Sequence, residues 1–428
     1  MIPSIHFLRR HKRLLACCVL AASFLVPAAT THAADNVDAT IRAAFEKGTL
    51  SEGQHVLETS LAAGPADANR LRYALGIVRF LRAGERLGQA WHHDGLFANR
   101  LTRSLPFFRL PVEPANEAAA TPVAYEDVRA AFVGFLADLK AADDTFAALP
   151  DDPGKVALRP GLVRVDYVGG GKPVDTETVW KTYQRINPGE SFEEKDAQEF
   201  LIRFDAGDVP WFRGYCHLLS AAVETILAYD ESALFDHTAH LFFSKPRTPY
   251  PFLLQGSGNA MNFDVAPLSD LLAFVHGLSF PPREPTRLLA ALDHLTQVPR
   301  FSRESWRRIL AETDDDHEWI PNPRQKGALP NPGVTQERVD AWLRMLDEAD
   351  AILAGKKLVP FWREGSPKAG LNLRRVFEQP STFDLFFWIQ GTAATQYLED
   401  GPVTDPEVWR GWRDAFSGEA LGFSLYFN

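Results

Sequence analysis

Cysteine is nearly absent from this sequence. The 428 residues include three cysteines, Cys17, Cys18 and Cys216. The first two lie in an apolar segment near the N-terminus, so removal of that segment would leave Cys216 alone and exclude a disulfide within the chain. Cys216 stands in the apolar stretch Tyr215–Leu219, which is typical of a buried structural thiol. Without disulfides, stability has to come from a large core, which roughly 395 residues can supply.

Long apolar runs are also missing beyond the first 33 residues, and none approaches the eighteen or so residues that a membrane-spanning helix requires. The N-terminal run, Leu14–Ala29, follows a basic cluster and precedes the small residues Thr31-His32-Ala33. This order is typical of a cleavable secretory signal peptide. We therefore expect a signal peptide at residues 1–33, a periplasmic or secreted location, and a mature chain without a membrane span.

Positive charge is in deficit. Lysine and arginine number 45 against 55 aspartates and glutamates, which gives a net charge of −10. Residues 1–33 hold four basic residues and no acidic ones, so the mature chain has 41 basic and 55 acidic residues and a net charge of −14. Such a chain has no electrostatic basis for non-specific nucleic-acid binding. The expected partner is a protein or a small-molecule ligand.

Complete catalytic motifs are lacking as well. Gly-x-Ser-x-Gly does not occur, and the segment 255–259 approximates it without the strand–turn–helix frame that the motif requires. Histidine pairs occur at His92-His93 and at His237 and His240, but no third ligand stands at a metal-binding spacing. His217 lies seven residues before Glu224, where both could share one helix face. These histidines point to ordinary core or surface positions.

Helical periodicity is abundant. Apolar residues recur at three- and four-residue steps over most of the length, and the pattern predicts a mostly α protein, an irregular multi-helix globular body. A helix beginning at Thr335 has the most regular spacing, and Gly355 follows it where a C-terminal cap belongs. The other predicted helices cover residues 37–47, 51–63, a segment after Gly64-Pro65, 124–147, 176–186, 210–229, 284–297, 302–313 and a segment opened by Asp405-Pro406.

A cluster of proline, aspartate and glycine at 150–154 marks the clearest break in the chain. After it, residues 162–166 alternate like a short strand and Gly169-Gly170-Gly171 turns the chain. We therefore divide the mature sequence into an N-terminal helical region (34–150), a small strand–turn–helix insert (151–205) and a C-terminal helical region (206–428).

The insert contains a twelve-residue segment, Asp166 to Glu177, that resembles an EF-hand calcium loop. Such loops need an acid at position one, a glycine at position six and a bidentate glutamate at position twelve. Asp166, Gly171 and Glu177 occupy those positions, and the Lys172 carbonyl is placed to add an oxygen. The resemblance implies a calcium site formed by Asp166, Lys172 and Glu177. More broadly, the chain resembles exported bacterial helical proteins of unknown function, which implies no activity.

The loop departs from the EF-hand pattern at several positions. Positions three and five, which normally bring carboxylates or amides, hold Val168 and Gly170. Position eight is Pro173, and position nine is Val174, whose side chain has no oxygen. A degenerate loop with negative charge at a helix N-terminus is the alternative interpretation.

A second acidic feature is the run Asp314-Asp315-Asp316-His317-Glu318 after the helix predicted at 302–313. Carboxylates at a helix C-terminus oppose the helix dipole, and such conflicts are expected at functional sites. Asp315, His317 and Glu318 are therefore candidate catalytic residues, acting as acid and base or through a divalent cation. The alternative is a solvated turn neutralised by bases close in sequence, namely Arg303, Arg307, Arg308, Arg324 and Lys326.

Three hypotheses follow from these patterns. The first is a non-catalytic, exported helical protein that binds a partner or ligand, with calcium as a possible stabilising ion. The second is a metal-assisted hydrolase or lyase that uses the run from Asp314 to Glu318. The third is a calcium-stabilised structural module formed through Asp166 and Glu177. The sequence leaves open whether the protein is an enzyme.

Overall fold

A computed structural model describes residues 28–110, 112, 120–172, 177–186, 194–255, 266–328, 333–363 and 369–415, with side chains from Asn36 onward. The predicted signal peptide lies mostly outside these residues. The fold is mostly α-helical, as the sequence predicts, and its strands form three small antiparallel sheets. Across the described residues, no helix combines the length and the apolar character needed to cross a membrane.

The helices of the N-terminal region follow the predicted pattern, except that the first begins at Ala28 instead of residue 37 and a short helix at Arg100–Ser104 is additional. They are α1 (Ala28–Glu46), α2 (Leu50–Ala62), α3 (Ala68–His93), α4 (Arg100–Ser104) and α5 (Tyr125–Ala147), with the 3-10 turn η1 (Pro106–Phe108). The break between α1 and α2 falls at Gly48, which has a φ of +79°. Thr49 then caps α2, because its hydroxyl accepts the Glu52 amide while the Glu52 carboxylate accepts the Thr49 amide.

The middle of the chain holds the short strands β1 (Val156–Leu158) and β2 (Ile202–Phe204), with α6 (Val179–Ile186) and α7 (Glu194–Glu199) between them. The two strands pair antiparallel, with Val156 opposite Phe204. Their side chains alternate, so Val156, Leu158, Ile202 and Phe204 face the core while Ala157 and Arg203 face outward. The strand predicted at 162–166 is reduced to a single bridge between Arg164 and Thr178.

The C-terminal region is also helical, and its described residues include five small strands. Its elements are α8 (Asp208–Leu227), α9 (Ser232–Thr238), η2 (Ala239–Leu241), η3 (Pro251–Leu254), α10 (Ala266–His276), β3 (Ser279–Phe280), α11 (Thr286–Ile309), α12 (Gln336–Leu353), β4 (Val359–Pro360), β5 (Ala369–Leu371), α13 (Leu373–Glu378), β6 (Phe383–Asp384), α14 (Leu385–Gln390), η4 (Thr392–Tyr397), β7 (Leu398–Asp400) and α15 (Pro406–Ala415).

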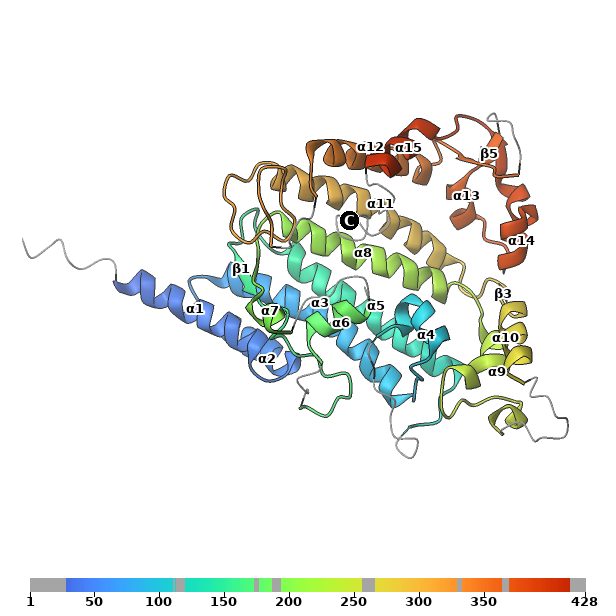
Figure 1. The fold of residues 1–428 in the computed structure, drawn as a ribbon, viewed down its shortest axis with the longest axis horizontal. Coiled ribbons are helices and arrows are strands. Elements are labelled where there is room, and N and C mark those ends of the chain that lie inside the picture. The colour runs from blue at the N-terminus through green and yellow to red at the C-terminus, as the bar shows by residue number, and fades with distance from the viewer. Residues whose placement is uncertain are drawn as a thin grey trace, which may run out of the picture.

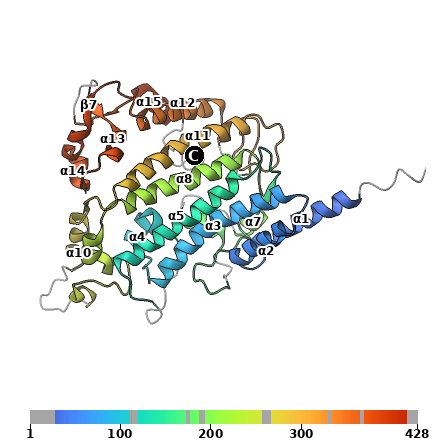
Figure 2. The same ribbon diagram turned by 180° about the vertical axis from the view of Figure 1, so that it is seen from behind.

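Four long helices, α3, α5, α8 and α11, lie side by side and organise the molecule (Figure 1 and, from behind, Figure 2). One hydrophobic core runs through them, from Val37 on α1 to Leu346 on α12. Trp91 and Trp306 are among its largest fully buried side chains. Cys216 on α8 is buried and unpaired, which confirms the structural thiol that its apolar surroundings predict. A second, small core forms around Tyr397 between the β4–β5–β7 sheet and the last helices.

The two helices predicted at 284–297 and 302–313 are one continuous helix, α11, and that helix ends at Ile309. Pro299 lies inside it and removes one backbone donor, which is the local signal that suggests a break. Pro299 is buried, and α11 packs along α8 over much of its length. Packing of the apolar face therefore outweighs the local cost of the proline.

Candidate functional site

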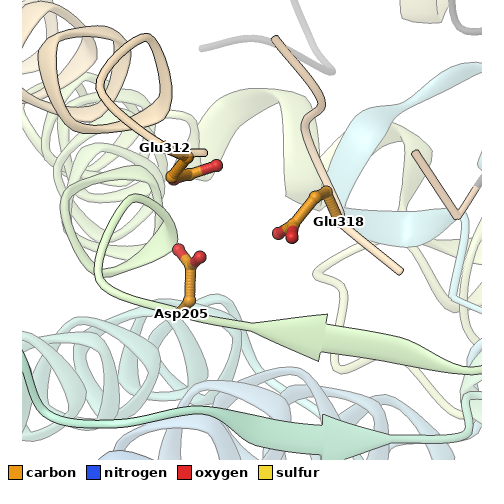
Figure 3. Close-up of side chains that lie close together, drawn as sticks. All are labelled: Asp205, Glu312 and Glu318. Atoms are coloured by element: carbon orange, nitrogen blue, oxygen red, sulfur yellow. The ribbon is translucent and has the colours of Figure 1, made fainter. Parts of the chain in front are cut away.

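The strongest concentration of functional side chains is a set of carboxylates where β2, α8 and the end of α11 meet. Asp205, Glu312 and Glu318 each offer an oxygen, and these three oxygens lie within 4.8 Å of one another. Figure 3 shows the three side chains reaching toward a common space from three different segments. We call this set the carboxylate triad.

Asp205 is placed by the turn that joins β2 to α8. Its Oδ1 accepts the Gly207 amide at 2.8 Å, while its own amide donates to Asp208 Oδ2 at 3.0 Å. The Asp205 carbonyl accepts the hydroxyl of the buried Tyr73 at 2.8 Å. Reciprocal side-chain and backbone bonds of this kind hold a turn rigidly. Asp205, 8% exposed, is therefore fixed at the entrance to α8.

Glu312 follows the end of α11. Gln325 Nε2 donates to its Oε2 at 3.2 Å, and the buried Asn322 side chain donates to the Ile309 carbonyl at 3.0 Å, which holds the turn in place. Gly207 makes the approach possible, since a Cβ at that position would lie 2.6 Å from Glu312 Oε1. A side chain at residue 207 would therefore displace the Glu312 carboxylate.

Glu318 enters from the loop after α11. Its side chain is 2% exposed, and its Oε1 accepts the Asp316 amide at 3.0 Å. The preceding residue, His317, has a φ of +61°, a conformation that costs a non-glycine residue energy. The His317 carbonyl accepts a hydrogen bond from the Arg203 amide of β2 at 3.0 Å, and this bond holds the loop against the two-stranded β1–β2 ribbon. This backbone geometry turns the Glu318 side chain inward while the His317 side chain stays exposed.

Further carboxylates surround the triad. Asp208 is buried beside Asp205, and Asp314 and Asp316 line the outer side. Lys155 lies 2.5 Å from Asp314 and 3.5 Å from Glu318, and Arg203 lies 3.4 Å from Asp316. Among the described residues, Lys155 and Arg203 make ion pairs with three of the six carboxyl groups, those of Asp314, Asp316 and Glu318. The cluster carries more negative charge than its basic neighbours neutralise.

Burial and the charges of neighbouring carboxylates raise the pKa values of Asp205, Asp208, Glu312 and Glu318. Burial, followed by the nearby charge of Asp205, raises the pKa of Glu312 to about 8. Burial also raises the pKa of Asp205 and of Glu318 and, together with the charge of Asp205, holds the pKa of Asp208 well above its usual value. Burial first, and then the charge of neighbouring carboxylates, therefore favours the protonated form of these four groups.

The candidate residues from the acidic run separate in the structure. Glu318 faces the triad, whereas Asp315 and His317 are exposed on the other side of the loop. Asp315 Oδ1 accepts the Lys326 amide at 3.0 Å, and His317 lies 3.3 Å from Asp316. No sequence motif identifies Asp205 or Glu312 as a candidate ligand. Their indirect signals were the position of Asp205 directly after a strand and that of Glu312 two residues before the acidic run.

The neutralising bases are also different from those close in sequence. Arg303 pairs with Asp347 and Asp350 of α12, and Arg307 pairs with Glu304. Arg308 pairs with Glu304 and Asp151, and Arg324 donates to backbone carbonyls. The charges of the run are instead met by Lys155 and Arg203. Asp314 lies five residues beyond the end of α11, so the last turn of that helix carries none of the three aspartates.

The segment that resembles an EF-hand lies elsewhere, and residues 173–176 of it fall outside the described part of the chain. Both carboxylate oxygens of the buried Asp166 accept backbone amides, from Gly169 at 2.8 Å and from Gly171 at 2.7 Å. Glu177 is buried, and its carbonyl accepts the Val165 amide at 2.7 Å; Lys172 is exposed. An antiparallel bridge between Arg164 and Thr178 closes the loop. Calcium binding by Asp166, Lys172 and Glu177 stays a prediction.

The candidate histidines contact other residues. His217 Nδ1 lies 2.7 Å from His294 Nδ1, and His217 Nε2 lies 3.7 Å from Asp143. His237 stacks on Tyr250. His240 lies 3.2 Å from Asp270, and His93 Nδ1 lies 3.0 Å from Asp94. The carboxylate triad itself consists of oxygen ligands alone, which are the ligands of hard cations.

Comparison with known proteins adds no name to this geometry. No protein-family model, no curated protein and no solved structure matches the chain.

Proposed function

We propose that this chain is an exported, non-catalytic binding protein whose carboxylate triad holds a hard divalent cation. The observation that supports this proposal most strongly is the convergence of Asp205, Glu312 and Glu318 within 4.8 Å of one another. Carboxylate oxygens are the preferred ligands of calcium, magnesium and manganese. A cation would also neutralise the negative charge that Lys155 and Arg203 leave unbalanced.

Calcium is the first choice among these ions. Calcium–oxygen distances of about 2.3–2.6 Å place the ligands of one ion up to about 5 Å apart, so three oxygens within 4.8 Å of one another fit a single calcium ion. Calcium also accepts the irregular ligand geometry that side chains from three segments provide, whereas magnesium demands a near-ideal octahedron. Backbone carbonyls and water would complete the six to eight ligands that calcium takes. We therefore place the proposed calcium site at the triad and not at the segment Asp166 to Glu177, where the sequence suggested it.

Thermal unfolding of the purified protein, first stripped with chelator, tests this proposal. A cation that binds the folded state stabilises it by mass action, by about 2.7 kcal/mol at a concentration one hundred times its Kd. We expect calcium to raise the melting temperature by several degrees, and we expect Asp205→Asn to abolish that rise. The asparagine keeps an oxygen for the Gly207 amide, so the variant should fold.

Two controls separate the possible calcium sites. Glu177→Gln alters the loop that resembles an EF-hand, and Asp315→Asn alters the exposed part of the acidic run; both variants should keep the full calcium response. A response lost in Glu177→Gln but kept in Asp205→Asn would assign calcium to the loop and overturn the proposal. No response in the wild-type protein would overturn it as well.

A second candidate function is metal-assisted hydrolysis or lyase chemistry at the same carboxylates. It is favoured by the Glu312 carboxyl, whose pKa of about 8 lets it keep a proton at neutral pH, as a general acid must, while Asp205 and Glu318 hold the cation. This candidate predicts turnover of simple esters or phosphoesters that requires calcium, magnesium or manganese and is lost in Glu312→Gln. Cleavage at equal rates by the wild type and Glu312→Gln would rule out this second function.

A further inference from the structure

A second site with the opposite charge lies on the outer side of the β1–β2 ribbon, against α1. It is a cavity of about 240 Å³. Five of its lining residues are basic and two are acidic, and two of the basic ones, Lys155 and Arg203, also pair with the neighbouring acidic run. The basic residues come from four segments: Arg42, Arg70, Lys155, Arg159 and Arg203. We call this site the basic cavity.

Both acidic residues of the basic cavity already have arginine partners. Asp38 pairs with Arg70, and Glu46 lies 3.2 Å from Arg159 Nη1. Arg70 is fully used, because it also contacts Asp67 at 3.2 Å and donates to the Lys155 carbonyl at 3.0 Å. Asp38, Glu46 and Arg70 are therefore held by their ion pairs, and their charges are largely neutralised within the cavity wall.

The remaining arginines keep unused donors. Arg42 lies between Asp38 and Glu46 on α1, yet it makes no ion pair or side-chain hydrogen bond with any residue that the structure describes. Arg203 is held by its Nε, 3.4 Å from Asp316, and its two terminal nitrogens have no partner within the described part of the chain. Arg159 uses Nη1 alone. Three guanidinium groups around one cavity therefore retain hydrogen-bond donors.

The chemistry of these donors selects the ligand. Guanidinium groups present paired N–H donors that match the oxygens of a phosphate group, and hydrogen bonds between two charged groups are the stronger ones. Apolar residues, including the outward-facing Ala157 and the half-buried Leu201, form part of the wall. The cavity is smaller than the roughly 300–1,000 Å³ of sites for drug-sized ligands, so it suits a small molecule.

We propose that the basic cavity binds phosphate, either as the free ion or as the phosphate group of a small molecule, through Arg42, Arg159 and Arg203. Arg203 is outward-facing because it occupies the exposed position of β2, between the buried Ile202 and Phe204. Its backbone is fixed by the ladder to β1 and by the bond to His317. The site is thus built on a rigid strand, and it does not require a cation in the carboxylate triad.

Calorimetric titration of the purified protein with inorganic phosphate, at low ionic strength and with chelator present, tests the proposal. We expect one phosphate per chain, and we expect the double variant Arg42→Gln/Arg203→Gln to bind at least ten-fold more weakly, as the loss of charged hydrogen bonds implies. Arg72→Gln is the matched control, since Arg72 bonds to Asn69 on α3 and does not line the cavity. It should bind phosphate like the wild type.

Chelator keeps this test independent of the proposed cation site. A second titration with phenyl phosphate identifies the source of the phosphate group. Tighter binding than that of the inorganic ion would assign the apolar wall to the rest of a small molecule, and equal binding would assign the cavity to the free ion. The absence of saturable binding by the wild type, or equal binding by the double variant, would overturn the proposal. A melting temperature within a few degrees of the wild type shows that the double variant is folded.

Discussion

Glu312→Gln is expected to raise the melting temperature of the chelator-treated protein at pH 8 and to weaken its response to calcium. The glutamine keeps the size of the side chain and removes a charge that burial and Asp205 both disfavour. We expect a gain of about 1–2 kcal/mol, because solvent screens part of the repulsion at this half-buried position. The loss of a ligand oxygen's charge should weaken calcium binding at the same time.

The pH dependence has a defined direction. The pKa of Glu312 is about 8 in the folded state and near 4.5 in the unfolded state, so the folded state binds more protons between these values. The contribution of this group to stability is therefore full below about pH 4.5 and is lost as pH rises toward 8. Calcium, by stabilising the charged carboxylates, should restore stability at the alkaline end of this range.

Thermal unfolding from pH 5 to pH 8, with and without calcium, measures this behaviour. The chelated wild type should lose stability toward pH 8, and Glu312→Gln should lose less. Asp315→Asn, which alters an exposed acid in the same run, is the control and should follow the wild type. A lower melting temperature for Glu312→Gln at pH 8 would show that its carboxylate stabilises the fold, contrary to the account.

The largest loss of stability is expected at Arg129, which is buried where α5 meets the end of α8. Arg129 donates to the Leu227 carbonyl at 2.9 Å and to the Tyr229 carbonyl at 3.1 Å, and it pairs with Glu284 before α11. Its charge thus meets the negative end of the α8 dipole. Arg129→Met would leave these carbonyls without their donor and Glu231 without the positive charge 4.0 Å away, while Glu284 keeps its pair with Arg287; the change should cost about 3–5 kcal/mol.

Arg86→Met is the matched control for this prediction. Arg86 lies on α3 and pairs with Asp138 of α5 at 2.7 Å, but its side chain is 51% exposed. Exposed pairs contribute about 0–1 kcal/mol. Chemical denaturation of both variants compares a buried and an exposed arginine on neighbouring helices. Similar losses in the two variants would show that Arg129 is not the link between α5, α8 and α11 that the hydrogen bonds describe.

Most of the fold could be predicted from the sequence because its information is local. Apolar periodicity, the cap at Thr335 and the glycine at 355 place α12 without reference to any other segment. The exception is α11, where Pro299 signals a break that packing against α8 overrides. Strand pairing was also out of reach, because the partners of β1 and β2 are set by contacts between segments more than forty residues apart.

The candidate site was less predictable because it is assembled from distant segments. Glu318 was identified from the acidic run, but Asp205 lies over one hundred residues earlier and stands in no motif. Lys155, the base that pairs with Asp314, directly precedes β1 and lies more than 150 residues before the run, so it is not among the arginines nearby in sequence. The run also gave no means to distinguish Glu318, which points inward, from Asp315 and His317, which the backbone at His317 leaves exposed.

Direct titration of the chelated protein with calcium at pH 8, in wild type and in Asp205→Asn, tests the central claim most directly. We expect saturable binding of one calcium ion per chain in the wild type and a loss of that binding in Asp205→Asn, while Glu177→Gln binds as the wild type does. Calcium binding that is unchanged in Asp205→Asn, or no binding by the wild type, would contradict the assignment of the carboxylate triad as a cation site.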